Sequence, residues 1–498
     1  MEAGGMNRTV AIVGAGIGGL AAAALLAKAG NRVTVFEQAE HTGGKAASVQ
    51  LGAYRFDTGP SLLTLPEVFR AFFARLGKDM RDYMELVPLE PLCAYEFADG
   101  TRLNSSSDRM RFAVELEEAG AATEAELEAY LEKSAQLWDW AGELFLTRSL
   151  HEPATYGSKA GVRAILHAAR LSPFRSLHEA NARAFADPRA AQLFDRYATY
   201  NGSSPFRTPA TMRIIPHVEY AYGGYALQGG IVALPRALER VVRELGVEFR
   251  LGSRVDRIVV AEGRCRGVEA GGKHFAADAV VSNADVLSTY RTLLREPQAR
   301  EARRAERLEP SSSGLVFLWG VAKRFPQLQV HNIFFSGDYR AEFDALFQRL
   351  EMPDEPTVYV NITSKLTPGD APAEGENWFV LLNAPRNAGQ DWAAVAARAR
   401  VAVLKRMSRA LGCDVGALIR EEKIIAPPDI ERATGSTHGS LYGIASHSPL
   451  SAFLRHPNRS RRIRGLYVAG GSAHPGGGMP LALLSGILAA DLAEKYES

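Results

Sequence analysis

The chain has 498 residues, enough for two or more domains, and its 46% hydrophobic and 23% charged content is that of an ordinary globular protein. A net charge of +2, without a long basic block, argues against nucleic acid as a partner. Three widely spaced cysteines, no secretory signal and no apolar stretch of bilayer length predict a cytoplasmic protein with no metal site, no disulfide framework and no spanning helix.

The first predicted unit, residues 9–37, is a strand, a glycine-rich turn, a helix and a second strand. The apolar, β-branched run 10–13 is typical of a strand buried on both faces. An Ala- and Leu-rich helix over 20–28 follows, and Gly30 stands at its C-cap. The second strand, 32–36, completes a βαβ unit of the kind that binds dinucleotides.

The turn in this unit has the G-x-G-x-x-G spacing. Gly14 permits the tight turn, Gly16 lets the backbone approach a diphosphate, and Gly19 lets helix and strand pack closely. The helix N-terminus offers amide groups to the phosphate charge, and Glu37 can accept hydrogen bonds from ribose hydroxyls. The unit predicts a dinucleotide site without choosing between FAD and NAD.

A second glycine turn, residues 41–46, follows directly. The pair Gly43 and Gly44 with the cation Lys45 could bring amide groups and a positive charge to a phosphate or to the flavin edge. The alternative is an ordinary surface turn, and the position just after the ribose-binding acid favours the functional interpretation.

Helical patterns dominate residues 61–220. The acidic stretch 113–145 predicts a solvated pair of amphipathic helices. Residues 153–178 contain no Asp or Glu, and the segment 156–178 combines cations with apolar residues, which is typical of a helix lying on an anionic membrane surface. One basic face of a helix with no membrane contact explains the same pattern.

Residues 223–285 form the next informative region. After two double glycines we expect a helix over 234–244, a strand pair around 247–249 and 255–260, and a strand at 279–285. The alternation in 255–260 indicates a small antiparallel element.

Residues 290–420 read as a further block of an appended substrate domain, with predicted strands at 315–320, 358–362 and 378–382 and a helix at 391–411. The aromatic residues of this block suit a long apolar tunnel or, equally, a plain core; they are Phe317, Trp319, Phe334 and Phe335.

The chain ends with another strand, glycine turn and helix, at 465–471, 476–478 and 481–496. The dipole at the start of this helix could stabilise the negative charge of a reduced flavin. Two such turns, at opposite ends of the chain, imply one domain assembled from both ends.

The stretches VAIVGAGIGGLAAA, GGKAAS, FDTGPSLLT, YGGYALQGGIVAL, VVSNADVLSTY and LYVAGGSAHPGGGMPLALLSG together resemble the bacterial phytoene desaturase and carotenoid desaturase family, within the flavin-dependent amine oxidase group. The resemblance implies an α/β fold: a Rossmann-like FAD-binding domain (GR2-type, built from both chain ends) with an inserted mixed α+β substrate domain. The expected FAD-binding domain is 1–90, 220–290 and 420–498, and the substrate and membrane-associating domain is 91–219 and 291–419.

By the same resemblance the cofactor is FAD. Glu37 would bind the adenosine ribose, and the backbone of Val255 would meet the adenine. The full set expected at the cofactor is Gly14, Gly16, Gly18, Gly19, Glu37, Gly43, Gly44, Lys45, Gly59, Pro60, Val255, Asn283, Gly470, Gly471, Gly477, Gly478 and Met479. The family commonly has Arg where this chain has Lys45, so the charge is kept but not the bidentate geometry.

Desaturation beside a polyene requires hydride removal to the flavin and loss of a proton. The developing positive charge is delocalised over the conjugated system, so a strong base is not required, and no paired carboxylates or Ser-His-Asp grouping is visible. His474 and Asp57 are weak catalytic candidates, with a backbone-bonded turn residue as the alternative for His474; Arg213 and His331 are weaker still.

Residues 331–340 resemble the branch that introduces the 3,4 (or 3′,4′) double bond into acyclic, often 1-hydroxylated carotenoids. Phytoene desaturation is the runner-up, and amine oxidation and polyene isomerisation are the remaining alternatives. The resemblance implies a long hydrophobic polyene substrate and peripheral association with the cytoplasmic membrane. The electron acceptor and the oligomeric state stay open.

Overall fold

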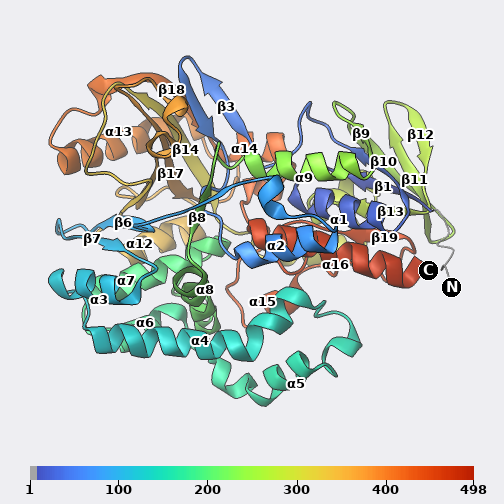
Figure 1. Cartoon of the computed structure of the whole chain (residues 1–498), viewed down its shortest axis with the longest axis horizontal. Coiled ribbons are helices and arrows are strands. Elements are labelled where there is room, and N and C mark those ends of the chain that lie inside the picture. The colour runs from blue at the N-terminus through green and yellow to red at the C-terminus, as the bar shows by residue number, and fades with distance from the viewer. Residues whose placement is uncertain (1–7, 498) are drawn as a thin grey trace.

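A five-stranded parallel sheet, built from distant parts of the chain, organises the right half of the molecule in Figure 1. The computed structural model describes residues 8–497. The strand order is β19-β13-β1-β2-β9, and each neighbouring pair is parallel. The strands are β1 Thr9–Val13, β2 Arg32–Phe36, β9 Glu248–Arg250, β13 Ala279–Ser282 and β19 Leu466–Val468. This parallel sheet confirms the predicted α/β class and its assembly from both chain ends.

One face of this sheet is covered by helices α1 (Ile17–Lys28), α9 (Ala233–Glu244) and α16 (Met479–Glu497). The first and last helices of the chain lie in close contact, since a Cβ at Gly486 would come 2.1 Å from the carbonyl oxygen of Gly18. Small residues thus let α1 and α16 approach, which joins the two ends of the chain into one core.

The two strands predicted around 247–249 and 255–260 both form, but the prediction that they pair with each other is wrong. β9 extends the parallel sheet beside β2, whereas β10 (Val255–Ala261) pairs antiparallel with β11 (Arg264–Ala270), which in turn pairs with β12 (Lys273–Ala276). Adjacent strands in sequence separate here because β9 arrives from a helix crossover, the geometry of a parallel sheet. The antiparallel element expected at 255–260 is confirmed.

A mixed seven-stranded sheet organises the left half of the molecule in Figure 1, with the order β18-β14-β17-β16-β15-β6-β7. Its strands are β6 Cys93–Glu96, β7 Arg102–Ser105, β14 Ser313–Val321, β15 His331–Phe334, β16 Val358–Asn361, β17 Glu376–Ala384 and β18 Ile419–Ile425. Phe317, Trp319 and Phe334 are buried in the core between this sheet and α13 (Trp392–Leu411), and Phe335 is buried in the neighbouring helical core. These rings are packed core residues.

Helices form the lower layer in Figure 1. The acidic helix pair is confirmed as α3 (Arg109–Glu118) and α4 (Glu124–Thr147). The other helices are α2 Pro66–Arg75, α5 Lys159–Leu166, α6 Leu177–Ala184, α7 Pro188–Asp195, α8 Ile214–Tyr222, α10 Val286–Ser288, α11 Arg300–Arg307, α12 Tyr339–Asp344, α14 Pro427–Thr434 and α15 Ser451–Leu454. Two further antiparallel pairs form separate two-stranded sheets: the hairpin β3 (Ser48–Leu51) with β4 (Tyr54–Asp57), and β5 (Leu86–Pro88) with the distant β8 (Tyr225–Leu227).

The predicted domain limit between 419 and 420 falls inside β18, which belongs to the seven-stranded sheet. The other domain limits stay a prediction. Residues 1–7 and 498, at the two ends of the predicted FAD-binding domain, lie outside the described residues. Within 8–497, no helix is long and apolar enough to cross a membrane, and no group of His, Cys, Asp or Glu could hold a metal ion.

Candidate functional site

The carboxyl edge of the parallel sheet, between β1 and β13, carries the first glycine turn. This is the point where the strand order reverses, and in open α/β sheets ligands bind there. Gly14 has φ +95°, and a Cβ at Gly19 would lie 2.1 Å from the carbonyl oxygen of Gly14. Gly16 is the N-cap of α1, and within residues 8–497 no side-chain capping hydrogen bond is made there. The amides of the first turn are therefore open to a phosphate.

Asn283 lies directly above this turn. It follows β13, and its amide nitrogen donates to the carbonyl oxygen of Val13 at 2.8 Å. A Cβ at Gly16 would come 2.7 Å from its Nδ2, and a Cβ at Gly18 would come 2.7 Å from its Oδ1. The Oδ1 atom is buried and has no hydrogen-bond partner among residues 8–497. This packing and the neighbouring α16 require a glycine at position 18. We call the turn of Gly14, Gly16 and Gly19 the cradle, and Asn283 offers one unpaired polar atom to it.

Glu37 ends β2 on the same edge and is 9% exposed. Its two carboxylate oxygens accept hydrogen bonds from the amides of Ala15 (2.7 Å) and Ala39 (2.9 Å). Each oxygen keeps a further lone pair, so the group can still accept from ribose hydroxyls. The Ser253 amide donates to the Glu37 carbonyl oxygen at 2.8 Å, which brings the segment leading to Val255 beside this acid.

The second glycine turn closes over the first. The Gly43 amide donates to the Ala15 carbonyl oxygen, and a Cβ at Gly44 (φ +59°) would lie 3.6 Å from the Gly16 Cα. Lys45 Nζ donates to the carbonyl oxygens of Ser440 (3.0 Å) and Leu441 (2.8 Å). Burial lowers the pKa of Lys45 to about 8, against the opposing effect of Asp285.

The loop after β4 lies against this turn, because a Cβ at Gly59 would come 1.9 Å from the Lys45 carbonyl oxygen. Gly59, with Pro60 next to it in the chain, thus lies directly beside the turn that contains Lys45. The GGK and DTGP motifs form one continuous wall beside the cradle.

The C-terminal turn supplies the opposite wall. Gly470 has φ +96° and lies against Asn283, and a Cβ at Gly471 would come 3.3 Å from Gly477. Gly477 packs on Tyr442, whereas Gly478 (φ +105°) has open space where its Cβ would lie. The buried Met479 then begins α16. A helix N-terminus and a side-chain-free turn therefore adjoin the cradle.

These features fit FAD. The uncapped amides of α1 suit a diphosphate, the spare lone pairs of Glu37 suit a ribose, and the open space at Gly478 suits a flat ring beside the start of α16. The individual residue roles stay a prediction.

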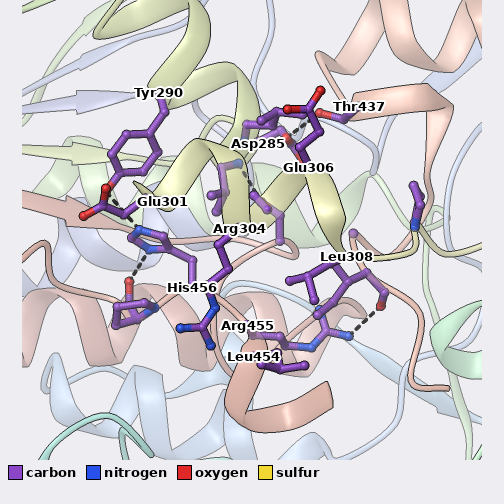
Figure 2. Close-up of a pocket in the computed structure, with 18 of the residues that line it drawn as sticks. Asp285, Tyr290, Glu301, Arg304, Glu306, Leu308, Thr437, Leu454, Arg455 and His456 are labelled. Atoms are coloured by element: carbon purple, nitrogen blue, oxygen red, sulfur yellow. Dashed lines mark hydrogen bonds between the residues drawn. The ribbon is translucent and has the colours of Figure 1, made fainter. Parts of the chain in front are cut away.

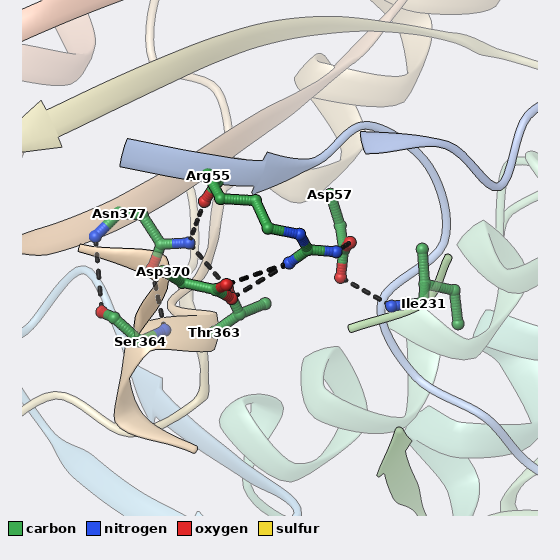
Figure 3. A network of polar contacts seen from close by, with 7 residues as sticks. All are labelled: Arg55, Asp57, Ile231, Thr363, Ser364, Asp370 and Asn377. Atoms are coloured by element: carbon green, nitrogen blue, oxygen red, sulfur yellow. Dashed lines mark hydrogen bonds and ion pairs between the residues drawn. The ribbon is translucent and has the colours of Figure 1, made fainter. Parts of the chain in front are cut away.

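Asp57 belongs to a structural network, shown in Figure 3. Its carboxylate is bound to Arg55 at 2.7 Å and accepts the Ile231 amide hydrogen at 2.8 Å. Arg55 also binds Asp370 at 3.1 Å. Burial raises the pKa of Asp57, and the Arg55 charge opposes this. Asp57 thus ties the DTGP motif to the GGIVAL motif, a role that accounts for its position without catalysis.

His474 is buried, and its Nε2 donates to the Arg148 carbonyl oxygen at 2.9 Å. Burial lowers the pKa of this imidazole to about 4. The Nε2–H group is used by the Arg148 carbonyl, and the lowered pKa keeps the ring neutral near pH 7. Both observations support the interpretation of His474 as a turn residue hydrogen-bonded to the backbone. Arg213 lies 4.2 Å above the Tyr130 ring in the helical layer.

His331 lies in a hydrogen-bonded row that sequence reasoning missed. Its Nδ1 is 2.6 Å from Tyr359 Oη, and this hydroxyl is hydrogen-bonded in turn to Ser61 Oγ. Ser61 lies inside the DTGPSLLT stretch and could have been noticed there. Tyr359 sits in a strand with no motif, so only the fold places it beside His331.

A cavity of about 360 Å³ opens next to the ends of β13 and β19 (Figure 2). Its lining includes Asp285, Tyr290, Arg304, Arg455 and His456. His456 Nδ1 donates to the Pro457 carbonyl oxygen at 2.6 Å, so its Nε2 accepts the Tyr290 hydroxyl hydrogen at 3.0 Å.

Arg455 joins this lining to the C-terminal turn. It donates to the carbonyl oxygens of Tyr442, Ile444 and Gly471. Through Arg455, the wall of this cavity is hydrogen-bonded to the C-terminal glycine turn and supports it.

Comparison with known families matches residues 17–493 to the flavin containing amine oxidoreductases. The chain is 43% identical to a 1-hydroxycarotenoid 3,4-desaturase of Flavobacterium sp. (strain P99-3), over 97% of this chain and 98% of the relative. It is 31% identical to a zeta-carotene-forming phytoene desaturase of Myxococcus xanthus, over 97% and 93%. Among solved structures, putrescine oxidase bound to putrescine has a TM-score of 0.64 at 15% identity, covering 98% of this chain and 99% of that one. An oxidoreductase from Methanosarcina mazei has a TM-score of 0.65 at 16% identity, covering 96% and 99%. These two structures share the fold.

Proposed function

Because the chain belongs to the flavin-containing amine oxidoreductase family, we propose that it is an FAD-dependent carotenoid desaturase. Its substrate is an acyclic, 1-hydroxylated C40 carotenoid, and the bond oxidised is C3–C4. The observation that carries this proposal is the 43% identity to the 1-hydroxycarotenoid 3,4-desaturase over nearly the full length of both chains. The phytoene desaturase is less similar, and the amine oxidase structures share only the fold.

In this proposal the cradle residues hold FAD. The first-turn amides of α1 bind the diphosphate, Glu37 binds the adenosine ribose, and the segment at Val255 adjoins the adenine. Gly44, Lys45 and the C-terminal turn border the flavin side. When bound, FAD supplies the hydride acceptor for oxidation of the C–C bond.

The chain needs no strong base for the accompanying proton loss, because the positive charge on the substrate is spread over the polyene. This agrees with the contacts of the two candidates: Asp57 is engaged by Arg55 and the Ile231 amide, and His474 donates to a backbone carbonyl. What the chain must supply is orientation of the C3–C4 bond in a site shielded from water.

The test is to incubate the FAD-loaded protein with a 1-hydroxylated acyclic carotenoid and an electron acceptor. We expect a red shift of the polyene absorption and the loss of two hydrogen atoms by mass spectrometry. Conversion of phytoene alone would select the phytoene desaturase alternative. Release of peroxide with amines as substrates, or isomerisation of the polyene without loss of hydrogen, would contradict the proposal.

We also infer that the protein binds the surface of an anionic membrane, where its hydrocarbon substrate resides. What supports this is the segment around α5, which exposes Leu166 (75%), Ile165 (58%) and Phe174 (93%). The same segment carries cations and no acidic residue between 153 and 178. Exposed apolar residues among cations are typical of interfacial segments.

Replacing Ile165 and Leu166 together by Glu is expected to weaken sedimentation with phosphatidylglycerol-containing vesicles about tenfold or more, since apolar burial and charge attraction are both lost. The matched control is Met110→Glu, an equally exposed apolar residue on the acidic helix α3. Equal binding of all three proteins would contradict the membrane proposal.

A further inference from the structure

Ser61, Tyr359 and His331 form a single row of hydrogen bonds that runs from the loop after β4 to the mixed sheet. Ser61 follows the Gly59–Pro60 loop, Tyr359 lies on β16, and His331 begins β15. Ser61 and Tyr359 are half-buried, whereas His331 is 3% exposed. Ser61 Oγ bonds to Tyr359 Oη, and Tyr359 Oη lies 2.6 Å from His331 Nδ1.

The direction of these hydrogen bonds follows from Asn361. Its Nδ2 donates to the Val330 carbonyl oxygen at 3.1 Å and lies 3.3 Å from His331 Nδ1. An amide nitrogen only donates, so Nδ1 acts as the acceptor of the pair. The Tyr359 hydroxyl therefore donates to Nδ1, and the Ser61 hydroxyl donates to the Tyr359 oxygen.

This polarity leaves the Ser61 oxygen with free lone pairs and no free hydrogen. The group that it can bind must then be a hydrogen-bond donor. The row does not serve as a proton store near pH 7, because burial lowers the pKa of His331 to about 3 and the Arg196 charge acts in the same direction. Its geometry suits recognition of a hydroxyl rather than base catalysis.

The row lies beside the proposed flavin site. Gly59, two residues before Ser61, contacts Lys45, and Gly44 contacts Gly16 of the cradle. In a 1-hydroxylated acyclic carotenoid, only C2 separates the hydroxyl-bearing C1 from the C3–C4 bond. A group that recognises this hydroxyl must therefore lie close to the reacting bond, and hence close to the flavin.

We propose that Ser61, oriented by Tyr359 and His331, accepts a hydrogen bond from the C1 hydroxyl of the substrate and so selects free 1-hydroxy end groups over 1-methoxy or unsubstituted ones. This inference rests on the proposed function, and it adds Ser61 as the residue that recognises the end group of the substrate. Tyr359 and His331 are positioning residues.

The experiment compares kcat/KM and fluorescence-quenching affinities of the FAD-loaded protein for three polyenes that carry a 1-hydroxy, a 1-methoxy or an unsubstituted end. The wild-type chain is expected to prefer the 1-hydroxy polyene. Ser61→Ala and Tyr359→Phe should each reduce the ratio of 1-hydroxy to 1-methoxy activity roughly tenfold or more, because a hydrogen bond to the substrate is lost or misdirected.

The matched control is Tyr95→Phe, which removes a buried hydroxyl that has no hydrogen-bond partner. It should leave the ratio unchanged, and the flavin absorption of every variant reports folding. Equal loss of activity on all three polyenes, or an unchanged ratio in both variants, would overturn the inference while the desaturase proposal stands. No desaturation of any polyene by the wild-type chain would overturn both.

Discussion

At the scale of single residues, the side chains with the most conspicuous chemistry serve to hold backbone segments together. Asp57 binds the Ile231 amide and Arg55, His474 binds the Arg148 carbonyl, and Arg455 binds three carbonyl oxygens near the C-terminal turn. Asp57 and His474 each join a glycine motif to a distant part of the chain, and Arg455 joins the C-terminal turn to the segment before it. The cradle is thus shaped by backbone and stabilised by buried polar side chains behind it.

Asp57→Ala tests this structural role. It leaves the half-buried Arg55 with one carboxylate partner fewer and the Ile231 amide without an acceptor, so we expect a loss of about 3 kcal/mol in the free energy of unfolding. Chemical denaturation followed by fluorescence measures it. Glu67→Ala, which removes an exposed ion pair with Arg70, is the control and should change stability little. A wild-type unfolding curve for Asp57→Ala, with activity abolished, would instead favour a catalytic role.

At the scale of elements, the contact between α1 and α16 joins the chain ends. The helices approach so closely that their small residues are required, as the Gly18 carbonyl lies against Gly486. The same helix α1 contacts the first strand through Gly19 and Gly14. Helix α1 is held on two sides by glycine contacts, which fixes the direction of its N-terminal amides.

Gly486→Ala should therefore destabilise the protein by about 1–3 kcal/mol, the usual cost of overpacking a core, and weaken FAD retention. Thermal unfolding and the flavin content after gel filtration measure both effects. The control Gly369→Ala places its Cβ in open space without positive φ, and it should behave like the wild-type chain. Equal behaviour of the two variants would contradict the proposed tight contact.

At the scale of the whole molecule, two sheet systems meet at the loop that follows β4. The parallel sheet offers the cradle, and the mixed sheet offers β15 and β16 with His331 and Tyr359. Ser61 lies between them and bonds to Tyr359. In our proposals, cofactor binding and end-group recognition therefore involve different sheets, and Ser61 on the loop after β4 connects them.

Stability of the whole molecule should fall as the pH is lowered from about 6.5 toward 4. Burial lowers the pKa values of His474 and His456 to about 4 and that of His331 to about 3, from an ordinary value near 6.5. In this window the unfolded chain binds protons that the folded chain does not, so each histidine contributes a slope of up to about 1.4 kcal/mol per pH unit.

The melting temperature between pH 4 and pH 7 measures this slope. His474→Gln keeps a donor for the Arg148 carbonyl and should flatten the dependence by about one proton. His274→Gln, at an exposed position on β12, should leave the slope as it is. An identical pH dependence in all three proteins would contradict the assignment.

The amino-acid sequence by itself determined the cofactor half of this protein. The two glycine turns are predicted to act through backbone amides, and Glu37 through its carboxylate just after β2. Each can therefore be recognised within a short stretch, and the α/β class followed from them. The strand pair at 247–260 was misjudged because pairing between distant strands is not a local property.

Only the tertiary structure assembled the residues that we propose for end-group recognition. Ser61, His331 and Tyr359 are separated by hundreds of residues or lie on different strands, and only strand pairing across the mixed sheet brings them within hydrogen-bond distance. It also decided that Asp57 and His474 bind backbone rather than stand free, since burial and partners are set by packing. The predicted nucleotide site uses the backbone of contiguous motifs, whereas the proposed end-group site uses side chains that only the fold brings together.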